Sequence, residues 1–201
     1  MKKILRLLTA LIIFLNCAVT FAEEEISEEE KIQRGIKIVS ENMHKKFPSS
    51  IDARIIGNDA TPEFILRYKD ISADYIRRSD NHYIKLNVDR ELIYIMGTRA
   101  AWNYGLTGIK NESENFSAAP TIGIALEMAI QPKVAVYTNI SGIVMGSCGH
   151  ICDFEGGFKY LPDKNFSWTI GWRHVDARIN WNKNHGEFKL SGFFTGVRAD
   201  F

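Results

Sequence analysis

The segment SCGHICD brings Cys148, His150 and Cys152 close together, and thiols and imidazoles at such spacing can form a disulfide or bind a metal ion. We predict a local Cys148–Cys152 disulfide, because the chain carries an export signal (below) and thiols oxidise outside the cytosol. A zinc site that uses His150 is the alternative, but the sequence offers no second ligand pair at zinc-like spacing. We therefore predict no metal site and no cofactor.

A second set of reactive side chains lies near the C-terminal end. His174, Asp176 and Ser167 fall on or near one strand-like segment, and such groups can act together in hydrolysis. His150 and His185 fall in segments expected to be loops. Because no nucleophile motif surrounds any serine, we predict no catalytic residue and no enzyme, and keep hydrolysis as the alternative.

The charge balance excludes one class of partner. The chain has 25 Lys and Arg against 24 Asp and Glu, with no clustered basic segment. A nucleic-acid-binding protein needs a concentrated basic face. We therefore expect no nucleic-acid partner.

The first 22 residues read as a secretory signal peptide. A positive start with Lys2, Lys3 and Arg6 precedes the apolar run 7–15, and Thr20-Phe21-Ala22 offers a cleavage site. An uncleaved N-terminal anchor is the alternative, although the apolar run is short for a spanning helix.

Residues 23–61 are expected to form a periplasmic helical segment. Ser27 and Glu30 have the spacing of a capping box, and Pro48 blocks further helix. Apolar residues recur between them at helical spacing, at Ile32, Ile36, Val39 and Met43. The pattern predicts one short amphipathic helix before the main domain.

From residue 62 to residue 201, apolar and polar side chains alternate with a period of two, which predicts strands. In TIGIALEMAI, one face is apolar from Ile122 to Ile130 and the other carries Glu127. Eight strands are predicted, at residues 63–78, 81–90, 92–105, 118–131, 133–146, 152–161, 165–180 and 185–201. The first could contain a break near Lys69-Asp70.

Three features favour a membrane barrel over a soluble sandwich. Most predicted strands exceed the length of about five or six residues usual in soluble sheets. Charges lie in mid-strand on the polar face, where we expect them to point inward and pair: Lys85, Arg99, Glu127, Glu155, Lys159 and Arg173. Links at one end are turn-sized (89–91, 131–133 and 162–165) and those at the other end are mostly longer, as in bacterial barrels. A soluble periplasmic β-protein is the alternative, because alternation alone fits both.

The chain ends in GFFTGVRADF, with Phe193, Thr195, Val197, Ala199 and Phe201 on one face of the last strand. With DFEGGFKY and FSWTIGWRHVDARI, this ending resembles small Gram-negative outer-membrane β-barrel proteins of the OmpX, OmpW and OmpA-barrel kind, over residues 62–201. In that family the barrel-assembly machinery reads a terminal strand that ends in Phe. The resemblance implies an assembly signal at Phe193, Val197, Ala199 and Phe201, and Ala199 departs from it because the family usually has an aromatic residue there.

The combined prediction is an all-β, closed, antiparallel, up-and-down transmembrane barrel of eight strands in the bacterial cell outer membrane. Outer-membrane lipid and the assembly machinery are its expected partners. Eight strands enclose an interior that side chains can fill, so we expect a structural, adhesion-like or small-ligand-binding role and not a wide pore, with an extracellular ligand unidentified. The resemblance also implies an alternative, a barrel enzyme that acts on lipid A or phospholipid through His174, Asp176 and Ser167.

Overall fold

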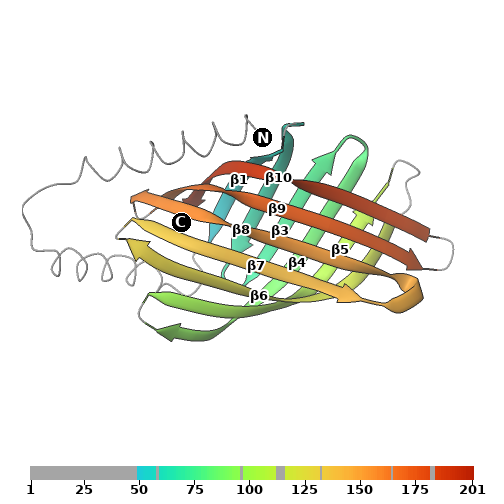
Figure 1. Ribbon diagram of the computed structural model, residues 1–201, viewed down its shortest axis with the longest axis horizontal. Helices are drawn as coiled ribbons and strands as arrows, with labels where there is room; N and C mark the ends of the chain where they lie inside the picture. The colour runs from blue at the N-terminus through green and yellow to red at the C-terminus, as the bar shows by residue number, and fades with distance from the viewer. Residues whose placement is uncertain are drawn as a thin grey trace, which may run out of the picture.

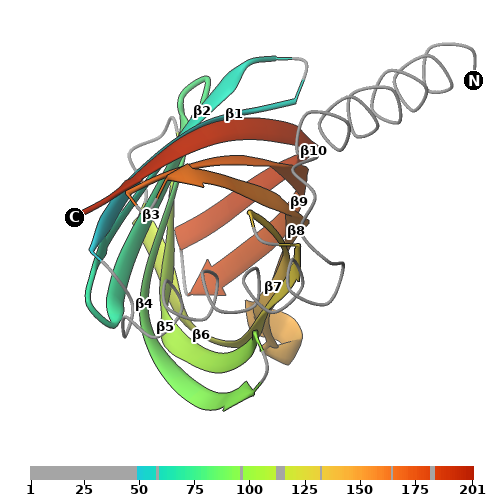
Figure 2. The same cartoon turned by 90° about the vertical axis from the view of Figure 1, so that its left-hand side faces the viewer.

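The computed structural model describes residues 49–57, 59–95, 97–111, 116–131, 133–163, 165–181 and 184–201. Within them, each strand pairs antiparallel with its neighbours in sequence, and the last strand returns to the first to close a barrel (Figures 1 and 2). The strands are β1 (Ser50–Ile56), β2 (Thr61–Tyr68), β3 (Ile71–Arg78), β4 (Asn81–Ile95), β5 (Thr98–Lys110), β6 (Phe116–Gln131), β7 (Val134–Val144), β8 (Gly149–Asp163), β9 (Phe166–Trp181) and β10 (Asn184–Asp200). The described residues also hold one 3-10 turn, η1 (Gly146–Cys148), and no helix long and apolar enough to cross a membrane.

The predicted closed antiparallel barrel is confirmed, but the predicted count of eight strands was wrong, because the described residues form ten. The predicted strand 63–78 is two strands, β2 and β3, joined by a turn in which Lys69 has a φ of 54°. Two-residue hairpin turns need positive φ, and Gly or Asn usually marks them. Lys69-Asp70 lacks that mark, so the alternation concealed the turn.

The second missing strand is β1. Its residues were assigned to the N-terminal helical segment, yet they pair with β2 on one side and β10 on the other. The barrel therefore starts at Ser50, before the predicted boundary at residue 62. The predicted signal peptide (1–22) and the amphipathic helix between Ser27 and Pro48 lie outside the described residues.

The boundary between β4 and β5 also differs from the predicted one. The turn predicted at 89–91 lies inside β4, and the chain turns at 96–97, where Gly97 has a φ of 76°. A β-bulge between Glu91 and Ile93 shifts the register by one residue. Because a bulge changes which face a side chain points to, the interrupted alternation looked like the end of a strand.

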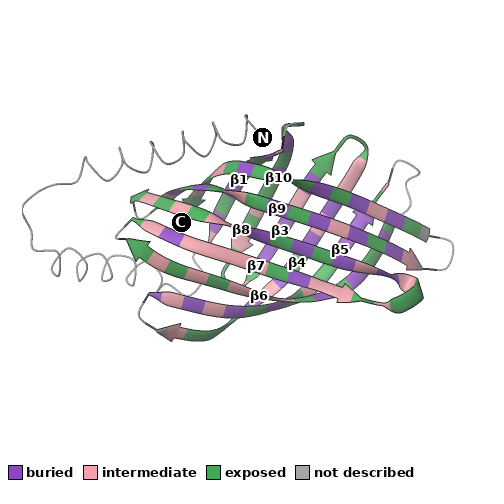
Figure 3. Ribbon diagram, in the orientation of Figure 1, coloured by how far each residue is buried: buried purple, intermediate pink, exposed green. Residues whose placement is uncertain are grey.

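Inward and outward side chains alternate along the strands, as the stripes in Figure 3 show. On β9, for example, Ser167, Thr169 and Arg173 are buried inside the barrel, whereas Trp168, Ile170 and Trp172 are exposed outside. The mid-strand charges predicted to point inward do so, and Lys85, Arg99, Glu155 and Arg173 are buried. The exterior is therefore apolar and the interior charged, the reverse of a soluble protein.

The two ends of the barrel differ. At the end that holds both barrel termini, the terminal end, Ser50 pairs with Asp200 and the amide of Phe201 donates to the carbonyl of Ser49 at 2.9 Å. Short links join the strands there, at 69–70, 96–97, 132–133 and 164–165. The opposite end, the far end, has three longer links, 57–60, 111–115 and 145–148, and two links of two residues, 79–80 and 182–183.

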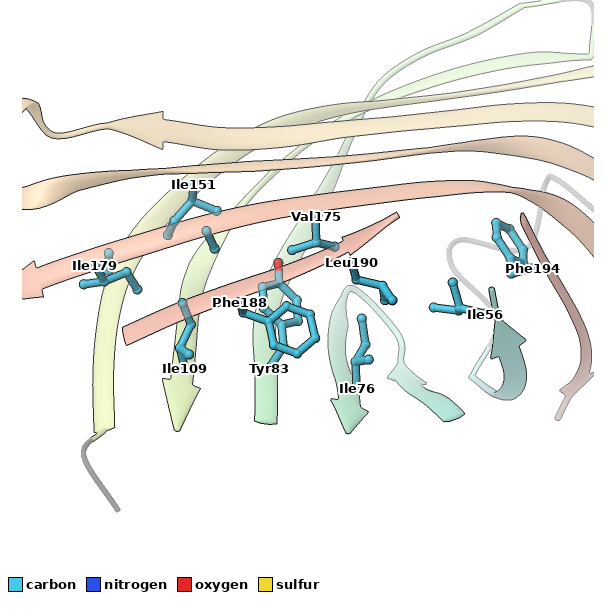
Figure 4. Close-up of a cluster of buried hydrophobic side chains, with 12 residues drawn as sticks. Ile56, Ile76, Tyr83, Ile109, Ile151, Val175, Ile179, Phe188, Leu190 and Phe194 are labelled. Carbon is cyan, nitrogen blue, oxygen red and sulfur yellow. The ribbon is translucent and has the colours of Figure 1, made fainter. Parts of the chain in front are cut away.

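An apolar core fills the far-end half of the lumen. It is built from buried side chains that eight strands contribute: Ala119 and Ala177 together with the residues labelled in Figure 4, which are Ile56, Ile76, Tyr83, Ile109, Ile151, Val175, Ile179, Phe188, Leu190 and Phe194. Tyr83 and Phe188 pack ring to ring, with centroids 5.3 Å apart. Because β1 ends at Ile56, β10 is paired with it only over 194–200, and the rest of β10 extends toward the far end beside β9.

Candidate functional site

Arg173, on β9, occupies the centre of an ion network in the middle of the lumen and is 1% exposed. Its guanidinium contacts four carboxylates, those of Glu63, Asp74 (2.6 Å), Asp153 (3.0 Å) and Glu155 (3.8 Å). These acids come from β2, β3 and β8. One side chain therefore ties together strands on opposite sides of the barrel.

Two more cations complete the network. Arg54, on β1, contacts Asp52 at 2.7 Å and Glu155 at 2.6 Å. Lys85, on β4, donates to Asp153 at 2.8 Å. Buried charges are tolerated only when they are paired and hydrogen-bonded. The interlocking contacts meet the pairing part of that condition, and they confirm the salt-bridged interior that the sequence predicts.

The terminal-end half of the lumen is polar but narrow. A cavity of about 130 Å³ remains there, and three ion pairs outside the central network contribute side chains to its lining. These are Arg67–Asp89 at 3.5 Å, Lys159–Glu127 at 2.5 Å and Arg198–Asp200 at 2.7 Å, of which all but Asp200 line the cavity. A cavity of this volume is large enough to hold water molecules among the paired charges.

The far-end part of β10 is held across the mouth of the barrel by side chains from other strands. Arg78, at the end of β3, donates to the carbonyl of Lys189 at 2.6 Å. Asn111, after β5, donates to the carbonyl of His185 at 2.9 Å. These bonds satisfy backbone groups of β10 beyond its pairing with β1. They hold the apolar side chains of β10 over the far-end core.

The outer surface carries an apolar belt. Its members are exposed aliphatic and aromatic side chains on the outward positions of the strands, among them Ile51, Phe64, Leu86, Leu106, Ile122, Ile124, Leu126, Phe158, Trp168, Ile170, Phe193 and Val197. Toward the far end of β9 the outward residues change from Trp172 to His174 and then Asp176. The belt therefore ends at a defined height on this strand.

Reactive residues predicted from the sequence are only partly brought together. Ser167 faces the lumen and is 1% exposed, whereas His174 faces outward, so the two cannot cooperate. His174 instead meets Ser191 of β10, with Nδ1 and Oγ 3.2 Å apart. Asp176 lies 3.5 Å from His150 Nε2 rather than beside His174.

The predicted disulfide is absent from the structure, where Cys148 and Cys152 are both free. Cys148 lies in η1, and β8 begins at the next residue. Strand residues advance by about 3.4 Å each, which carries Cys152 roughly 10 Å along the strand from its start. A disulfide needs Cα atoms within about 7 Å. Among the described residues no three His, Cys, Asp or Glu side chains form a metal-binding group, so the alternative zinc site is also unsupported.

Sequence reasoning missed most acidic partners of the network, namely Asp52, Glu63, Asp74 and Asp153, and the cation Arg54. The segment SIDARII did contain the signal, since Asp52 and Arg54 alternate with Ile51, Ala53 and Ile55. At the C-terminus, the outward positions proposed as an assembly signal are confirmed to share the outer face, with Phe193 66% and Phe201 72% exposed. Their role as a signal stays a prediction.

The fold and the lumen together define a class, a closed ten-strand barrel with an apolar exterior and a charged, side-chain-filled interior. No protein-family model and no curated protein matches the chain. A solved structure titled "KdgM porin" is similar over 76% of this chain and 99% of that chain, at 13% identity and a TM-score of 0.40. A likeness this distant carries no argument for family or function.

Proposed function

We propose that the chain is an outer-membrane β-barrel whose lumen is closed, and which works through its outer surface and far-end mouth rather than by passing solutes. The apolar belt is the observation that carries the proposal. Large side chains such as Ile124 (54% exposed) and Trp168 (58% exposed) point away from the protein over most of its surface. Lipid is the solvent that favours this arrangement, and it requires a sheet that closes on itself, as β10 does by pairing with β1 over 194–200.

The direction of insertion follows from the two ends. Bacterial barrels have short periplasmic turns and longer extracellular loops. The terminal end, with its short links, is accordingly periplasmic, and the far end is extracellular. Phe201 then lies at the periplasmic rim, where the resemblance to small outer-membrane barrels assigns it to an assembly signal.

The closed lumen supports a structural or small-ligand-binding role over a pore. The apolar core blocks the far-end half, and the ion network crosses the middle. In planar bilayers, the wild-type protein should show no stable open conductance in 1 M salt. Stable open channels would contradict the closed lumen but leave the membrane assignment in place.

A lipid-facing barrel and a soluble one respond in opposite ways to a charge on the belt. Arg in place of Ile124, at the middle of the outward positions of β6, should cost about 2–4 kcal/mol in a bilayer. On a soluble protein the same change would be nearly neutral. Cys152→Arg is the matched control, because Cys152 points outward beyond the belt and opposite Asp176. The measurement is urea unfolding of the protein in lipid vesicles, together with heat-modifiable gel mobility of the membrane fraction.

The Ser191–His174 contact favours a second candidate function, hydrolysis of a lipid ester at the far-end edge of the apolar belt. Ser191→Ala should then abolish release of labelled acyl chains from phospholipid or lipid A. Ser167→Ala, a buried serine that faces the lumen, should leave release unchanged. If the wild-type protein releases no acyl chain, the second candidate is rejected.

A further inference from the structure

Three basic side chains stand side by side on the outer surface at the far end of β3, β4 and β5. They are Arg77, His82 and Lys110, which we call the basic row. The strand register pairs Arg77 with His82 and His82 with Lys110, and their positions all point outward. Neighbouring strands lie about 4.8 Å apart, so the row extends over roughly 10 Å.

The basic row differs from the other outward cations of the far end in its partners among the described residues. Arg77 and Lys110 are both exposed, and neither forms an ion pair with another of the described residues. Other outward cations of the far end do form one: Arg178 and Lys189 both contact Glu187, at 3.5 and 3.2 Å. The basic row therefore offers positive charge that an external anion can meet.

The middle member of the row is held in position. The hydroxyl of Tyr75 lies 2.7 Å from His82 Nδ1, and the two rings stack with centroids 5.9 Å apart. Because Nδ1 is engaged by Tyr75, Nε2 is the ring nitrogen of His82 that is left to meet a ligand between Arg77 and Lys110.

The height of the row suits a lipid head group. The outward residues on the periplasmic side of it, along β4 and β5, include Leu86 and Leu106, both about half exposed. The row thus lies at the far-end edge of the apolar belt, next to the turn at Ser79-Asp80. In the proposed orientation, this is the boundary between acyl chains and head groups of the outer leaflet.

We propose that the basic row binds the phosphate groups of a diphosphorylated glycolipid of the lipid A type in the outer leaflet. The inference rests on the proposed membrane function. Arg77 can hold a phosphate with two parallel hydrogen bonds, and Lys110 attracts one as a point charge. A head group with two phosphates meets both cations at once, whereas a phospholipid with one phosphate meets only one. Charge complementarity and spacing thus favour the glycolipid.

The test uses the full chain, folded in a neutral detergent, with lipid binding measured by native mass spectrometry. The probes are diphosphorylated lipid A, monophosphorylated lipid A and phosphatidylglycerol. The variant is Arg77→Gln with Lys110→Gln. The matched control is Arg178→Gln with Lys189→Gln, which removes two outward cations at the same end of β9 and β10.

The wild-type protein should bind diphosphorylated lipid A at least tenfold more tightly than the other two lipids. The basic-row variant should lose at least tenfold in that affinity, and the control less than threefold. Equal losses in both variants, or equal binding of phosphatidylglycerol, would overturn the proposal. Every variant must keep the heat-modifiable gel shift. If the wild-type protein lacks that shift, the membrane function itself fails; if the shift is present without lipid selectivity, only this inference fails.

Discussion

Replacing Arg173 by Met should destabilise the barrel strongly. Arg173 is buried and contacts four carboxylates, but these do not all depend on it equally. Asp153 keeps Lys85, whereas Glu155 and Glu63 keep Arg54, at 2.6 and 3.5 Å. Asp74 has no other ion-pair partner among the described residues. The substitution therefore leaves one buried carboxylate without compensation.

The expected loss in the free energy of unfolding follows from this single unpaired carboxylate, Asp74. Removing one partner of a buried ion pair costs about 3–5 kcal/mol, because the remaining charge stays desolvated. The same reasoning predicts rescue: Asp74→Asn added to Arg173→Met removes the orphaned charge and should recover at least about half of the loss. Arg178→Met is the control on the same strand, since its side chain is 45% exposed and its pair with Glu187 is screened. Exposed pairs contribute about 0–1 kcal/mol.

The assay is equilibrium urea unfolding in lipid vesicles, followed by tryptophan fluorescence and by heat-modifiable mobility. Both probes report the closed barrel, so coincident transitions support a single free energy of unfolding. The reasoning is refuted if Arg173→Met lies within about 1 kcal/mol of the wild type. It is equally refuted if Asp74→Asn deepens the loss instead of reversing it.

Three further predictions concern the far-end core, a glycine of β8 and the C-terminal residue. Phe188→Ala should cost about 3–5 kcal/mol in the same urea assay, because it removes a 2% exposed ring from the far-end core; a loss below about 1 kcal/mol would mean that this core does not seal the lumen. Gly157→Ala should abolish the heat-modifiable shift, since its Cβ would lie 2.3 Å from the carbonyl oxygen of Ile170, while Gly156→Ala, with its nearest atom at 3.4 Å, should keep it. Phe201→Ala, or a few polar residues added after it, should lower the amount of inserted barrel in cells without changing the urea midpoint of the protein that does insert. Normal insertion of that variant would remove the basis for a terminal assembly signal.

The inward and outward positions of most strands could be predicted from sequence, because alternation is a local property. The outward positions of β6 and β10 and the inward direction of Lys85 and Arg173 were predicted correctly. Errors arose where local signals failed. The turn at Lys69 has no glycine, and the bulge at Glu91 reversed the alternation inside one strand. The structure gives no support to the predicted disulfide, because Cys148 and Cys152 are both free in it.

The sequence by itself determined which side chains share a face of each strand, since a period of two assigns each residue to one of two faces whatever lies opposite. Only the tertiary structure decided which charges meet. Arg173 finds Glu63 and Asp74 across the lumen, from strands far away in the chain. The same holds for Ser191 beside His174 and for the row of Arg77, His82 and Lys110. Partners on different strands depend on register and on closure of the sheet, and neither quantity is written in the spacing of residues along one strand.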